Sequence, residues 1–169
     1  MRLTNLILLF LLLAISCSKK KDDKPVSNLK PWDGRYTVTG TLVDYTEAVI
    51  ASAGPREYSL SPDASGKAQV LCKDLGLNAH LITHGGSLSY YSRFGLIITI
   101  DPQTNKITGL VNSYGQPSAN GRSAVLDPSG TNTFDPATKT LKMRYWMDET
   151  GVTGHKAAFD ETWTYLGPR

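Results

Sequence analysis

The sequence is poor in cysteine and histidine, and these shortages narrow the classes of protein it can belong to. Its 169 residues include two cysteines, Cys17 and Cys72, and three histidines. Two cysteines exclude a disulfide scaffold, in which several bridges replace a large hydrophobic core. His80 and His84 are four residues apart, a spacing that favours a metal site only on a helix, and no cysteine or acidic residue flanks them. We therefore predict no metal site and no cofactor.

A basic surplus is missing from the part of the chain that is expected to fold. The formal net charge is +3, but residues 1–30 hold six of the 18 basic residues and two of the 15 acidic ones. Residues 31–169 therefore carry 12 basic and 13 acidic side chains. Because a nucleic-acid-binding domain needs a basic face, we expect no nucleic-acid partner.

Long helical periodicity is also missing, and apolar side chains alternate instead with a period of two, as in half-buried strands. The alternation is strict over residues 35–44, 139–147 and 157–166. The continuous apolar run at 96–100 predicts a strand buried on both faces. Residues 45–53 are compatible with one or two helical turns. Further strands are expected at 56–62, 67–72, 106–113 and 122–127, with 79–84 as an extra strand or a turn.

Turn signals separate these segments. Aspartate precedes proline at 101–102, 127–128 and 135–136, and aspartate in this position favours type I turns. Short strands joined by tight turns predict an all-β fold, an antiparallel meander of about eight strands. We expect it to close into a lipocalin-like barrel, which removes exposed edges, and a β-sandwich is the alternative. The last predicted strand ends near the C-terminus, as a barrel requires if this strand pairs with the first.

The N-terminus predicts where the protein is located. Residues 1–16 have one basic residue and then a short apolar run, which is typical of a signal peptide and too short to cross a bilayer. Cys17 follows small residues at Ala14 and Ser16, as in bacterial lipoproteins, so we predict that Cys17 is lipidated and anchors the protein to a membrane. Residues 17–30 are charged and predict a disordered tether. We expect a single domain over residues 31–169.

Several segments resemble known proteins. Lys21-Asp22-Asp23 resembles the export signal of Bacteroidota surface lipoproteins, and a solvated linker is the other interpretation. Trp32-Asp33-Gly34 at the start of the first strand resembles the opening of lipocalin-like barrels, in which the tryptophan plugs one end, although the order of Trp and Gly differs. Both resemblances imply an outer-membrane lipoprotein, exposed at the cell surface, with a barrel domain.

A wider resemblance covers nearly all of residues 32–169. It rests on three groups of segments: 32–40; 114–117 with 120–122; and 159–165 with 167–169. They resemble an uncharacterised family of Bacteroidota surface lipoproteins. In that family the region is often the C-terminal domain of longer proteins encoded near outer-membrane glycan importers of the SusC/SusD type. The resemblance implies polysaccharide or an importer complex as partner, and it supplies no catalytic residues.

The residues themselves contain no recognisable catalytic set. Ser123 and Ser129 lack the Gly-x-Ser-x-Gly context, and Asp160 and Glu161 are adjacent, so that on a strand they point to opposite faces. We interpret Cys72 as a buried, inert thiol because it follows an apolar run. We therefore predict that the protein is not an enzyme.

Five residues are candidates for ligand binding. Glu161 shares the apolar face of its strand, which predicts a buried pair with Arg35 or Arg122, a position near a barrel mouth, or a polar anchor in a ligand cavity. Trp146 is expected to face outward, and aromatic rings together with polar groups suit sugars. The other candidates lie in or near loops: Tyr90, Tyr91 and Tyr114. The alternative is that Tyr90 or Tyr91 packs in the core and that Trp146 covers an outer seam of the sheet.

Two functions remain open from the sequence. The first is a non-catalytic surface module for the capture of glycans or other nutrients. The second is a structural or interaction subunit of an outer-membrane complex that has no small-molecule ligand.

Overall fold

The computed structural model describes residues 30–52, 55–72, 80–84, 87–91 and 94–169, and within these ranges the regular structure is β-strand throughout. The strands are β1 (Gly34–Asp44), β2 (Val49–Ser52), β3 (Arg56–Pro62), β4 (Ala68–Cys72), β5 (His80–His84), β6 (Ser87–Tyr91), β7 (Leu96–Ile100), β8 (Ile107–Asn112), β9 (Arg122–Leu126), β10 (Thr133–Asp135), β11 (Thr140–Glu149) and β12 (Ala157–Gly167). The predicted all-β class is confirmed.

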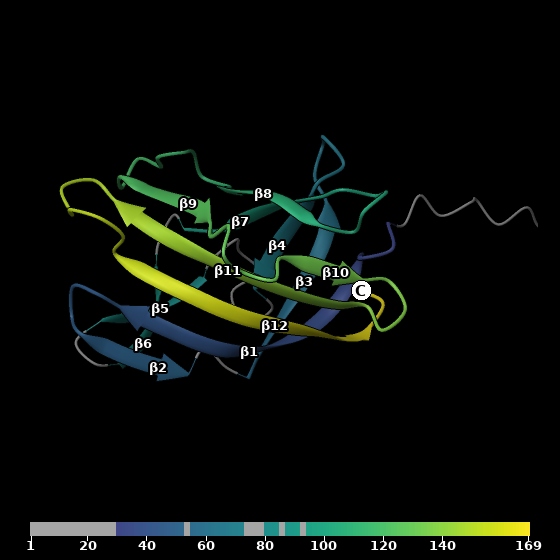
Figure 1. Cartoon of the computed structure of the whole chain (residues 1–169), viewed down its shortest axis with the longest axis horizontal. Helices are drawn as coiled ribbons and strands as arrows, with labels where there is room; N and C mark the ends of the chain where they lie inside the picture. Colours follow the sequence, from purple (N-terminus) through teal and green to yellow (C-terminus); the bar gives the residue numbers. More distant parts are fainter. Residues whose placement is uncertain (1–29, 53–54, 73–79, 85–86, 92–93) are drawn as a thin grey trace, which may run out of the picture.

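The strands form an antiparallel sheet that curves around on itself. Neighbours follow the order β10-β11-β12-β1-β3-β4-β7-β8, with β2 also paired to β1 and β9 to β11. The first and last strands pair over most of their length, as expected from the sequence, so the C-terminus lies beside the start of β1 (Figure 1). A bridge between Lys106 and Thr133 joins the two ends of this path. The result is a nearly closed barrel, which confirms the predicted lipocalin-like fold over the sandwich.

Side chains complete the closure between β8 and β9. The side-chain carbonyl of Gln116 accepts hydrogen bonds from the backbone N–H groups of Asn112 (2.9 Å) and Ala124 (3.0 Å), and its amide nitrogen donates to the Ala124 carbonyl at 2.6 Å. The side chain of Asn112 donates to the carbonyl of Arg122 at 2.9 Å. The backbone ladder is interrupted between β8 and β9. These side-chain bonds take the place of ladder bonds for the backbone groups at that gap.

The alternating residues of β1, β11 and β12 fill the interior, as predicted. The largest fully buried side chains are mostly aromatic: Trp163, Tyr36, Tyr58, Tyr145, Phe94 and Phe159. Rings of neighbouring strands pack on one another, for example Tyr145 on Phe159 with centroids 4.6 Å apart. Each such side chain stabilises the fold by about 1.5–3 kcal/mol through burial. Around the described strands, the barrel interior is therefore a packed core.

The chain enters the barrel beside Trp32 and Asp33, just before β1 begins. Trp32 is buried there, and its carbonyl accepts a hydrogen bond of 2.6 Å from the Tyr36 hydroxyl. Asp33 binds the guanidinium of Arg169 at 2.7 Å, which ties the last residue to the first strand. Trp32 is thus buried at the start of β1, and its expected role as a plug at one end of the barrel stays a prediction.

Two local predictions are wrong. Residues 45–52, the described part of the segment 45–53, do not form a helical turn, because residues 45–48 make a turn and β2 pairs back onto β1. The run at 96–100 is not buried on both faces: Leu96 and Ile98 are buried, but Ile97, Thr99 and Ile100 are half-buried. Strand β7 therefore covers the core with one face only. The short strands β2, β6 and β10 were not expected.

Candidate functional site

The outer face of β11 carries the candidate site. Burial alternates along this strand, so that Lys142, Arg144, Trp146 and Asp148 point away from the core. This outward orientation of Trp146 confirms the prediction. Trp146 lies between Val125 of β9 and Ala158 of β12.

Trp146 is part of an aromatic stack. The imidazole of His155, in the β11–β12 connection, lies on the indole with centroids 4.0 Å apart and planes 6° from parallel. The Nδ1 atom of His155 lies 2.7 Å from Oδ1 of Asp148, which orients the imidazole ring. Both polar side chains remain more than a third exposed. The stack thus presents polar atoms to solvent beside an aromatic surface.

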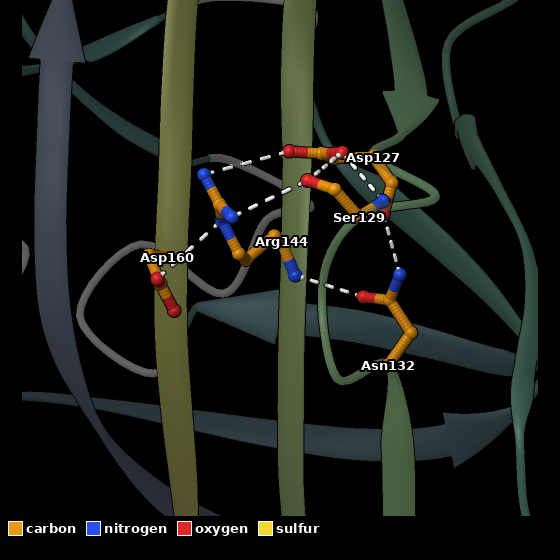
Figure 2. A network of polar contacts seen from close by, with 5 residues as sticks. All are labelled: Asp127, Ser129, Asn132, Arg144 and Asp160. Atoms are coloured by element: carbon orange, nitrogen blue, oxygen red, sulfur yellow. Dashed lines mark hydrogen bonds and ion pairs between the residues drawn. The ribbon is translucent and has the colours of Figure 1, made fainter.

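A second polar group adjoins it on the same strand (Figure 2). The guanidinium of Arg144 lies 3.6 Å from Oδ2 of Asp127 and 3.5 Å from Oδ2 of Asp160, and it donates to the Ser129 hydroxyl at 3.3 Å. The side-chain carbonyl of Asn132 accepts from the Arg144 amide at 2.9 Å. These contacts fix the arginine in one position over the sheet.

The carboxylate of Asp127 stays charged in this group. Burial raises its pKa, but hydrogen bonds from the hydroxyl and amide of Ser129 and the charge of Arg144 lower it further, and the pKa ends below its ordinary value of 3.8. The Ser129 hydroxyl donates to Asp127 at 2.7 Å. This serine therefore does not face a histidine base as a nucleophile would.

Glu161 lies on the opposite side of the sheet, inside the barrel. Only 1 % of the residue is exposed, and its Oε2 accepts a hydrogen bond of 2.9 Å from the indole N–H of Trp163. The hydroxyl of Tyr145 also bonds to it, and burial followed by the nearby Glu161 raises the pKa of Tyr145 well above 10. The predicted arginine partners pair elsewhere, Arg35 with Glu57 and Arg122 with Glu149.

The structure does not bring the predicted ligand residues into one site. Trp146 and Glu161 are separated by the sheet itself. Tyr114 is 41 % exposed and lies in the β8–β9 connection. Tyr90 and Tyr91 belong to β6, but their side chains, like that of Cys72, lie outside the described part, as does Cys17. Trp146 is therefore the one predicted residue at the centre of the candidate site.

Four neighbours of Trp146 were not predicted as site residues: Asp127, Asp148, His155 and Asp160. Asp148 had a sequence signal, because it continues the outward alternation of Arg144 and Trp146. Asp127 was read only as a turn residue. The positions of His155 and Asp160 depend on how β12 and its connection pair with β11, and period-two alternation carries no information on register.

Other features of the described residues do not add a site. No group of three or more potential metal ligands occurs among them. The described part also contains no helix that is long and apolar enough for a bilayer crossing. A shallow hollow of about 360 Å³ over β10 and β11 is lined mainly by threonines, and another of about 220 Å³ lies beside Trp32.

The chain has no match among models of protein families, curated proteins or solved structures. The candidate site therefore has to be interpreted from its own geometry.

Proposed function

We propose that the protein is a non-catalytic lipoprotein of the cell surface whose barrel binds carbohydrate at Trp146. The observation that carries the proposal is the Trp146–His155 stack, flanked by fixed polar groups of Arg144 and Asp148. Sugars have C–H faces that pack on aromatic rings and hydroxyl groups that need both donors and acceptors. The site offers both kinds of contact, and its hydroxyl and imidazole are not arranged for nucleophilic catalysis.

The direction of the strands supports the location. The predicted tether joins the barrel at residue 30, beside the start of β1, whereas Trp146 lies towards the end of β11, near the far end of the barrel. A lipid on Cys17 would therefore be joined to the end of the barrel that lies opposite the stack. In this position the stack would meet soluble or fibrous glycans outside the cell.

Replacing Trp146 tests the carbohydrate site. We expect Trp146→Ala to weaken binding of the purified protein to immobilised polysaccharides by about tenfold or more, measured by affinity electrophoresis over a panel. Leu166→Ala is the matched control, because Leu166 is also an apolar residue on an outward position of the sheet, 49 % exposed on β12. Equal binding by the two variants, or no retention of the parent protein on any polysaccharide, would refute the proposal.

A second candidate function is an interaction subunit of an outer-membrane complex. The observation that favours it is the exposure of Ile50 (76 %) and Tyr45 (56 %) on and beside the β1–β2 turn. Apolar side chains this exposed are typical of protein contacts when they lie together. Co-purification with an importer, weakened by Ile50→Asp, in a protein that binds no polysaccharide, would favour this function over the first.

A further inference from the structure

The strand register places apolar side chains in one row across the outer face. Trp146 is paired with Val125 on one side and Ala158 on the other, Ala158 with Val43, and Val43 with Ile50. The five residues belong to β9, β11, β12, β1 and β2, which follow one another across the face turned to the viewer in Figure 1. We call Val125, Trp146, Ala158, Val43 and Ile50 the apolar row.

The row is long compared with the ring of one sugar. Neighbouring strands are about 4.8 Å apart, so five strands extend the row over roughly 19 Å. Its members are at least partly accessible: four are half-buried, among them Trp146, whose indole is covered on one face by His155, and Ile50 is 76 % exposed. Trp146 is thus one part of a surface that continues over the sheet to the β2 edge.

A polar row runs beside it, one outward position further along each strand. Arg144 pairs with Asp160, Asp160 with Thr41, and Thr41 with Ser52. We call Arg144, Asp160, Thr41 and Ser52 the polar row. Arg144 and Asp160 form an ion pair at 3.5 Å, and the other two members are neutral hydroxyls. The polar row therefore has no net charge and offers hydrogen-bond donors and acceptors along its length.

We infer that the two rows bind an extended, unbranched and uncharged polysaccharide that lies across the strands, an inference that rests on the proposed function. A β-1,4-linked chain of neutral sugars is a flat ribbon with apolar C–H faces and hydroxyl groups along both edges. One face of such a ribbon packs on the apolar row while one edge meets the polar row. This class of ligand is inferred because the apolar row and the polar row run side by side across the same strands.

Charge and shape argue against other glycans. Three carboxylates lie near Trp146, those of Asp127, Asp148 and Asp160, and Arg144 already contacts two of them. An acidic polysaccharide would face these like charges, and Lys142, the next outward cation on β11, lies beyond the polar row and farther from Trp146 than Arg144. A helical α-linked chain would turn its edge away from the polar row after a few sugars.

The inference is tested by varying the length of the oligosaccharide and by mutating Ile50, which lies at the far end of the apolar row. Calorimetry would compare cello-, manno- and xylo-oligosaccharides with maltohexaose. For at least one β-linked series we expect the hexasaccharide to bind about tenfold or more tightly than the disaccharide. Ile50→Asp should remove most of this gain and leave disaccharide binding unchanged. Leu166→Asp is the control, because it places the same charge on an exposed outer position away from both rows.

The outcomes separate the inference from the proposed function. In one outcome sugars bind and Trp146→Ala abolishes binding, but neither oligosaccharide length nor Ile50→Asp changes the affinity. Binding along the apolar row is then refuted, and the carbohydrate site at Trp146 stands. Tighter binding of maltohexaose than of the β-linked oligosaccharides also refutes binding of a β-linked chain along the row. If no saccharide binds at all, the proposed function itself fails. Thermal unfolding of each variant shows whether a loss of binding reflects a loss of fold.

Discussion

At the scale of single residues, Glu161 shows how a carboxylate can be accommodated in a hydrophobic core. It lies opposite Gly40 of β1, whose missing side chain allows the backbone of β12 to approach closely. The indole of Trp163 and the hydroxyl of Tyr145 donate to the carboxylate. A buried carboxylate with such partners supports packing, whereas one without them would be costly.

The variant Glu161→Gln should therefore affect stability. The amide oxygen can keep the Trp163 bond at Oε2, but the Oε1 position then carries an NH₂ group that must find an acceptor in the core. We expect a loss of about 1–3 kcal/mol in the free energy of unfolding, measured by chemical denaturation. Binding of saccharides should be unchanged below the melting temperature. Lost binding with unchanged stability would instead place Glu161 in a ligand cavity.

At the scale of elements, the barrel depends on a loop side chain at the join between β8 and β9. The side chain of Gln116 bonds to the backbone of both β8 and β9, in place of direct ladder bonds. The two strands contact each other beside this residue, but no continuous register joins them. The join therefore depends on a few specific side-chain atoms.

Removing that side chain should open the join locally. In Gln116→Ala we expect faster amide hydrogen exchange at Asn112 and Ala124, whose N–H groups donate to Gln116. Amides of β1 and β12, which pair over ten positions, should keep their protection. Gln69→Ala on β4 is a comparison variant, since Gln69 lies within a regular ladder with Ser61 and Ile97. Unchanged exchange at Ala124 would contradict this role of Gln116.

The long strands could be predicted from the sequence, but their partners could not. Tyr36, Val38 and Leu42 alternate with polar residues, so the face of β1 that enters the core was evident. The four residues of β2 are too few for a periodic signal, and only pairing with β1 makes them a strand. The apolar row follows from the same kind of information. Val125 and Ile50 are 75 positions apart in the sequence, and the register alone brings them into line with Trp146.

At the scale of the whole molecule, acid stability depends on aspartates that close turns. Four of them have pKa values below the ordinary 3.8: Asp63, Asp101, Asp127 and Asp135. Backbone or side-chain hydrogen bonds within the turn lower the pKa in each case, and at Asp63 and Asp127 they outweigh burial, which raises it. The turn aspartates are therefore a common source of pH dependence spread around the barrel.

The sign of this dependence follows from proton binding. Between the lowered pKa of the folded state and 3.8, the unfolded chain binds more protons than the folded chain at these four positions. Their contribution to the free energy of unfolding is therefore complete above about pH 4 and is lost as the pH falls through the folded-state pKa values. We expect the melting temperature to fall as the solution is acidified from pH 4 towards pH 2. Asp127→Asn should be less stable at pH 7 and should lose less stability on acidification, because the group that takes up the proton is gone. A variant that keeps the parent's full pH dependence would show that Asp127 contributes nothing to it, and the acid sensitivity would then have to arise at carboxylates outside the Arg144 group.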